Sequence, residues 1–172
     1  MHPADHPRSA GGAALGARLR RASAAIDADA ARIYAALGID FEQRWFGVLA
    51  ALAREDALTV SELAATLGVS HAAVSQVRHA LEQRGLILSA TDPADARRRK
   101  LMLSADGSRL VERLAPLWAA FAEAAAELDR DAGGIVQSLD ELEAAMARKS
   151  LYDRILPRVP GLAHSAGGPS ES

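Results

Sequence analysis

The most regular pattern of apolar positions lies in residues 13–37. Large apolar side chains and alanines recur there every three or four residues, which is the period of one face of an α-helix. The stripe consists of Leu15, Leu19, Ala22, Ile26, Ala30, Ile33 and Leu37. Gly38 follows it and is typical of a residue that ends a helix. A second helix is expected to begin near Phe41. Its expected buried positions are Trp45, Val48, Leu49 and Leu52.

The same period returns twice in the C-terminal third of the chain. Ser104 is expected to cap a helix, and Pro116 is expected to bend it, because proline removes one helical hydrogen bond. Gly133 and Gly134 interrupt the pattern, and a last helix is expected to run on to Ile155. The apolar positions of the two helices are Leu110, Leu114, Leu117, Phe121 and Leu128, then Ile135, Leu139, Leu142 and Met146.

Residues 59–85 have the pattern of two short helices joined by a tight turn. Thr59 and Glu62 are spaced for a capping box, in which each side chain bonds the other residue's free amide. Gly68 suits the left-handed backbone that the turn needs, and Ser70 suits the cap of the second helix. This pattern predicts a helix-turn-helix. Its expected buried positions are Leu63, Leu67, Val69, Val74, Val77 and Leu81.

The outward face of the second of these helices is polar. Glutamine can make paired hydrogen bonds to an adenine edge, and serine and histidine can reach base edges or phosphates. The alternative is an ordinary solvated helix face. We interpret the face as a DNA-binding surface and include the two capping residues. The candidate set is Thr59, Ser70, His71, Ala72, Ser75, Gln76, Arg78 and His79.

After Gly85 the pattern changes from helical to extended. Residues 86–91 are predicted to form a strand, residues 92–95 a turn, and residues 101–103 a returning strand. Four cations lie near the tip of this β-hairpin, or wing: Arg97, Arg98, Arg99 and Lys100. Such a wing can lie over a phosphate backbone and place an arginine in a narrow minor groove. The alternative is a basic surface hairpin that is kept soluble by its charge.

The distribution of charge changes what the net charge implies. The 172 residues carry a formal net charge of −2, which by itself argues against nucleic-acid binding. Residues 70–100, however, contain six basic and three acidic side chains, a net charge of +3. Residues 104–154 contain six basic and ten acidic side chains, a net charge of −4. A basic segment on an acidic body indicates a local contact with a polyanion.

Several functions are not expected from the composition and motifs. The chain has no cysteine, so disulfides and thiolate metal sites are excluded. Its five histidines are scattered, and it has no nucleophile elbow, phosphate-binding loop or zinc-protease motif, so we expect no enzyme, no metal and no cofactor. It also has neither a signal-peptide pattern nor an apolar run long enough to cross a bilayer, which predicts a cytoplasmic protein without membrane contact.

The wing carries a resemblance to a known family. Asp95-Ala96-Arg97, followed by Leu103-Ser104, is similar to the wing signature of the MarR family of bacterial winged-helix regulators. The order of elements matches the family over residues 13–155. The resemblance implies a homodimer that places two recognition helices in successive major grooves of a near-palindromic operator. Family members often have arginine where this chain has Gln76, so no base preference is carried over.

The resemblance also implies a small-molecule effector in some members, held between the dimerisation and DNA-binding parts. Trp45, Phe46 and Trp118 are candidates to line such a site, and the alternative is that they belong to the core. The helices outside the winged domain have two interpretations as well. They pack on the middle of their own chain, or they also pair with a second chain.

The expected fold is therefore mainly α with a small β-wing. The expected organisation is a tail at 1–12, a dimerisation helix at 13–37, a winged helix-turn-helix domain at 38–103, dimerisation helices at 104–156 and a tail at 157–172. The expected function is sequence-specific binding of double-stranded DNA in transcription regulation, as a repressor that blocks polymerase access, although activation is equally compatible with the sequence. The alternative is a winged-helix module that binds a protein partner.

Overall fold

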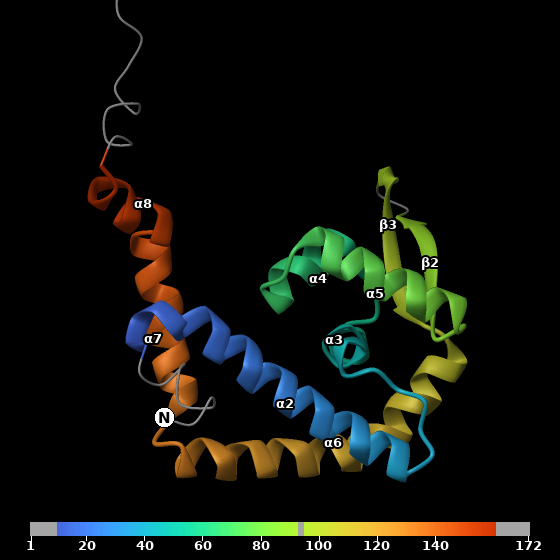
Figure 1. The fold of residues 1–172 in the computed structure, drawn as a ribbon. Coiled ribbons are helices and arrows are strands. Elements are labelled where there is room, and N and C mark those ends of the chain that lie inside the picture. The colour runs from blue at the N-terminus through green and yellow to red at the C-terminus, as the bar shows by residue number, and fades with distance from the viewer. Residues whose placement is uncertain (1–9, 93–94, 161–172) are drawn as a thin grey trace, which may run out of the picture. The chain divides into compact units, whose positions relative to one another are not determined.

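The computed structural model describes the backbone of residues 10–92 and 95–160 and the side chains of residues 10–91 and 99–160. The chain divides into two compact units, of which the first ends at Leu114 and the second begins at Ala115. Figure 1 shows the order of the elements along the chain.

The first unit contains a long helix, a helix-turn-helix and a small sheet. The long helix and the segment before the helix-turn-helix are η2 (Gly11–Ala14), α2 (Leu15–Ala36), η3 (Gln43–Trp45) and α3 (Phe46–Arg54). The winged part consists of β1 (Leu58–Thr59), α4 (Val60–Leu67), α5 (His71–Gln83), β2 (Ile87–Asp92) and β3 (Asp95–Leu103). The first turns of α6 (Ala105–Asp131) complete the unit.

The sheet has three antiparallel strands in the order β1-β3-β2. Leu101 of β3 pairs with Leu58 of β1 on one side and with Ser89 of β2 on the other. The predicted hairpin is confirmed, but β3 already begins at Asp95, so the cationic segment is part of the strand. Strand β1 was not predicted, because a strand of two residues has no periodicity of its own and exists only through its pairing with β3.

The core of this unit lies where α3, α4, α5 and the sheet meet. Its largest fully buried side chains include Trp45, Leu49, Leu63, Leu81 and Leu101. Burial of Val74, Val77 and Leu81 in α5 was predicted, and it leaves the opposite face of that helix to solvent. The expectation that Val69 fills the corner between α4 and α5 was wrong, since its side chain is 45% exposed. The turn is closed instead by backbone bonds, including Val69 N–H to the Ala64 carbonyl at 3.1 Å.

The helix α3 begins at Phe46, later than the expected start near Phe41. Phe41 is buried in non-helical chain, with its ring centroid 4.7 Å from that of Tyr34 and 5.6 Å from that of Trp45. Its side chain thus packs in the core before the helix starts. Tertiary contacts of this kind place the start of a helix in a way that apolar spacing does not reveal.

The helix α2 confirms the predicted long helix, but most of its apolar stripe is not covered. The helix buries Ala30 and Tyr34. Five large side chains of the stripe are 38–56% exposed, namely Leu15, Leu19, Ile26, Ile33 and Leu37. The described residues therefore leave an apolar face exposed along α2, interrupted where Ala30 is buried.

The second unit contains the rest of α6, then α7 (Ile135–Arg148), α8 (Leu151–Ile155) and η4 (Leu156–Arg158). The helix α6 is continuous, with Pro116 inside it. The predicted break is confirmed at Gly133 and Gly134, which have φ angles of 80° and 83°. The last helix does not run on to Ile155, because Ser150 interrupts it and caps α8 by accepting a bond from Asp153 N at 3.1 Å. Neither α7 nor α8 buries any of its side chains.

Candidate nucleic-acid interface

The helix-turn-helix is held at its start by a complete capping box. Thr59 Oγ1 accepts a hydrogen bond from Glu62 N at 3.2 Å, and Thr59 N donates to Glu62 Oε2 at 2.7 Å. Thr59 Oγ1 also donates to the same carboxylate oxygen at 2.8 Å. The side chain of Thr59 is therefore engaged inside the chain, and the residue is only 4% exposed. Its place in the structure is that of a positioning residue for α4, away from the exposed polar face.

The helix α5 presents the predicted polar face to solvent. Gly68 turns the chain with a φ of 63°, and Ser70 caps the helix by accepting a bond from Ala73 N at 3.2 Å. Because Val74, Val77 and Leu81 point into the core, the polar residues share the opposite side. His71, Ala72, Gln76 and His79 are exposed, and Ser75 and Arg78 are half-buried. The structure thus brings together six of the predicted residues on one helix.

Arg78 lies at the margin of this face rather than at its centre. Its Nε is 3.9 Å from Glu82 Oε2, which is within ion-pair range but too long for a hydrogen bond. Among the described residues this buried Nε has no hydrogen-bond partner. Arg78 is accordingly held against its own helix, whereas Gln76 and His79 extend into the solvent.

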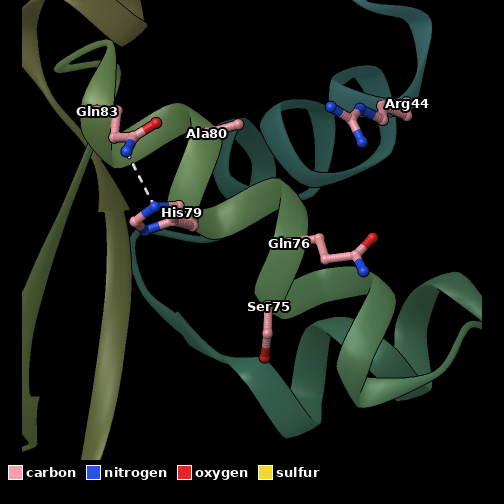
Figure 2. A pocket seen from close by; sticks show the side chains of 6 residues that line it. All are labelled: Arg44, Ser75, Gln76, His79, Ala80 and Gln83. Carbon is pink, nitrogen blue, oxygen red and sulfur yellow. Dashed lines mark hydrogen bonds between the residues drawn. The ribbon is translucent and has the colours of Figure 1, made fainter.

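The polar face is hollowed at its middle, as Figure 2 shows. The hollow has a volume of about 440 Å³ and is lined by Arg44, Ser75, Gln76, His79, Ala80 and Gln83. Gln83 Nε2 lies 2.9 Å from His79 Nε2, so the amide donates when that ring nitrogen is unprotonated. Arg44 and Gln83 were not predicted to belong to this surface. Arg44 lies 35 residues before His79 in the chain, and only the fold brings it beside α5.

The two wing cations whose side chains the structure describes differ in exposure and in their neighbours. Arg99 is exposed, and the side chains of Arg97 and Arg98 lie outside the described residues. Lys100 is half-buried between Thr59 and Ala90 across the sheet, and it shares a separate hollow of about 350 Å³ with Glu55 and Glu62. Successive residues of a strand point to opposite faces, so Lys100 and Arg99 do not belong to one patch. Lys100 lies beside two carboxylates, which reduces its contribution to a polyanion contact.

The three predicted aromatic residues are not equivalent. Trp45 is fully buried, with the Arg84 guanidinium carbon 4.6 Å from its ring centroid and Asp40 paired with that guanidinium. It therefore belongs to the core of the first unit. Phe46 is 37% exposed and belongs to the same unit, whereas Trp118 is partly exposed and belongs to the second unit.

Two other classes of site are absent from the part of the chain that the structure describes. No group of three or more histidine, aspartate or glutamate side chains is placed to hold a metal ion there. No helix within those residues combines the length and the apolar content that crossing a bilayer demands.

Known proteins resemble this chain in sequence and in fold. A model of the MarR family matches residues 37–98, and no curated protein matches the sequence. A structure of BpsR from Bordetella bronchiseptica, concerned with regulation of its DNA binding by 6-hydroxynicotinic acid, is 26% identical with a TM-score of 0.60. The match covers 75% of this chain and 92% of that one. The transcriptional repressor CouR bound to a 23-mer DNA duplex is 28% identical with a TM-score of 0.56, over 78% of this chain and 90% of its own.

A third structure supports the fold alone. MepR from S. aureus in complex with DNA is 20% identical with a TM-score of 0.64, over 76% of this chain and 96% of its own. Each of the three matches covers at least 75% of this chain. The chain is therefore similar to MarR-family winged-helix regulators, in sequence over residues 37–98 and in fold over about three quarters of its length.

Proposed function

We propose that this chain acts as a homodimeric repressor that binds a near-palindromic operator through α5 and the wing. The observation that carries the proposal is the polar outward face of α5, which is followed in the chain by a hairpin whose sequence contains Arg97, Arg98 and Arg99. Phosphate contacts from the wing supply affinity, and the α5 side chains supply the choice of sequence. CouR, whose solved structure contains a DNA duplex, supports this assignment.

The polarity of α5 favours DNA over a protein partner. A helix that docks on a protein usually exposes large apolar side chains at the centre of its interface. The exposed residues of α5 are instead histidine, glutamine and one alanine at the positions that face outward. Hydrogen-bonding side chains on a helix suit the base edges of a major groove, which is wide enough to admit that helix.

The exposed apolar stripe of α2 supports the proposal that the chain pairs with a second copy of itself. Five large apolar side chains stand 38–56% exposed along one face of this helix. A monomer in water gains nothing from such a face, whereas a twofold interface covers it with the same stripe of the partner. The second unit also exposes apolar side chains, including Ile135, Val136, Met146, Leu151 and Ile155. We assign these surfaces to dimer contacts.

A homodimer explains the expected form of the operator. Two α5 helices related by a twofold axis enter successive major grooves, so the half-sites are about one helical turn apart. The dimer then blocks polymerase access when the operator overlaps a promoter. A ligand that changes the separation of the two helices releases the DNA, because the grooves have fixed spacing.

The effector is proposed by analogy with BpsR, which is regulated by 6-hydroxynicotinic acid. Phe46 in the first unit and Trp118 in the second each stay a separate candidate for contact with a small aromatic anion, since each side chain is partly exposed. Trp45 is not a candidate for direct contact in this conformation, because the core covers it completely.

Selection from a pool of random duplexes tests the proposal. The full chain is incubated with the pool, and the bound fragments are recovered and sequenced. The expected result is one motif with twofold symmetry and half-sites about 10 base pairs apart. An asymmetric motif would contradict the dimeric mode of binding, and recovery of no motif at all would contradict sequence-specific binding.

A further inference from the structure

Arg44 is part of the polar surface although it does not belong to α5. It lies in η3, and its side chain lines the hollow together with Gln76, Ala80 and Gln83 (Figure 2). At 100° per residue, Gln76 and Ala80 lie toward one edge of the exposed face of α5, and Arg78 lies toward the other. Arg44 therefore adds a cation at the edge opposite Arg78.

The backbone that carries Arg44 is firmly held. The next residue, Trp45, is fully buried, and its ring packs edge-on against Phe41 with the centroids 5.6 Å apart. Arg84 follows α5, and its guanidinium carbon lies over the Trp45 ring, 4.6 Å from the ring centroid. This contact ties η3 to α5. The position of Arg44 relative to α5 is thus fixed by core packing, while its own side chain remains 55% exposed.

Within the described chain, the guanidinium of Arg44 makes one hydrogen bond, which fixes its orientation. Its Nε donates to Glu42 Oε2 at 2.6 Å, and the Glu42 side chain is 43% exposed. Within residues 10–91 and 99–160, neither terminal nitrogen of Arg44 makes a hydrogen bond. An arginine that is held through Nε keeps its two terminal amino groups for another acceptor, and phosphate oxygens suit that fork.

The dimensions of DNA determine which acceptor lies there. A helix with its side chains is about 10–12 Å across, and the major groove is about 12 Å wide. When α5 fills the groove, a side chain from a neighbouring element beside α5 meets the wall of the groove, which is the phosphate backbone. A base edge at the floor is reached only from α5 itself.

We propose that Arg44 binds a DNA phosphate at the edge of the major groove entered by α5, and that Glu42 holds the guanidinium for this contact. The inference rests on the proposed function, because it assumes that α5 enters a groove. It adds a positioning contact that is independent of sequence, on a different element from the wing.

The test compares Arg44→Gln with Arg54→Gln by fluorescence anisotropy on a labelled pool of 30-base-pair duplexes of random sequence. Both variants remove one positive charge, but Arg54 is at the other end of α3 and is followed by the acids Glu55 and Asp56. Each protein is titrated between about 50 and 200 mM salt. Thermal unfolding of both variants confirms that they fold like the wild type.

The expected result is specific to Arg44. Loss of one phosphate contact lowers the slope of log K against log salt by about 0.9, and it weakens binding at 100 mM salt by roughly 5-fold. Arg54→Gln should keep the wild-type slope. Glu42→Gln should keep or raise the affinity, because its amide oxygen can still accept from Arg44 Nε while one negative charge near the phosphate is removed. An Arg44→Gln variant with wild-type slope and affinity overturns the inference while the proposed function stands. Failure of the wild type to bind any duplex overturns the proposed function itself.

Discussion

Gly107 provides the sharpest test of how the wing is joined to the helix that follows it. It lies in the first turn of α6 and is buried against the backbone of Leu86, just before β2. A methyl group at position 107 would stand 3.0 Å from the carbonyl carbon of Leu86 and would overlap the carbonyl oxygen. That oxygen also accepts a hydrogen bond from Ser104 N at 3.0 Å, so the backbone cannot yield without cost.

The cost of Gly107→Ala follows from three contributions. Overpacking against a backbone atom destabilises by about 1–3 kcal/mol. Weakening of the bond from Ser104 adds up to roughly 1 kcal/mol. The higher helix propensity of alanine offsets about 1 kcal/mol. The net effect is a destabilisation of about 2 kcal/mol, where propensity alone would predict a gain of stability.

Urea unfolding of the full chain at one fixed protein concentration measures this effect. With a slope of about 2 kcal/mol per molar urea, the midpoint should fall by roughly 1 M. Gly16→Ala is the matched control, because Gly16 also lies in the first turn of a helix and its nearest contact would be the end of Arg20 at 3.5 Å. The control should leave stability unchanged or raise it slightly. If both variants gave the same midpoint, the close packing of α6 on Leu86 would be refuted.

Two further predictions concern the DNA-binding surface. Gln76→Ala should cost roughly 1–3 kcal/mol of binding free energy, mainly on the selected site, because the side chain is exposed on the α5 face. Competition between the selected and a random duplex measures it, and equal losses on both would count against base reading. Replacing Arg97–Arg99 by alanine should weaken binding to every sequence and flatten its salt dependence, which anisotropy titrations measure. An unchanged slope of log K against log salt would show that the wing does not contact the DNA.

The helices and the turn between them could be predicted because their signals are local. Each of these signals concerns backbone groups within four residues of it. The structure confirms the capping box of Thr59 and Glu62, the left-handed turn at Gly68 and the helix cap at Ser70. The polar face of α5 followed from the same periodicity. Such local patterns predict the fold well, because a helix that buries its apolar face exposes its polar face to solvent.

The features that escaped prediction depend on contacts distant in sequence. Phe41 is held out of a helix by Tyr34 and Trp45, and β1 exists only because β3 pairs with it. Arg44 joins the candidate surface because Trp45 anchors η3 beside α5. Lys100 was grouped with the wing arginines from its position in a cationic run, but strand alternation places it beside acids. Neither spacing nor composition contains these relations.

The central claim is that the outward face of α5 lies in the DNA groove, and Ala72 tests it directly. Ala72 is exposed on that face and has no side-chain polar group, so Ala72→Glu leaves the fold intact while adding a negative charge to the contact surface. At about 50 mM salt the wild type should bind a labelled duplex tightly, and the affinity of Ala72→Glu should be at least 10-fold lower. Equal binding by the two proteins would contradict the claim.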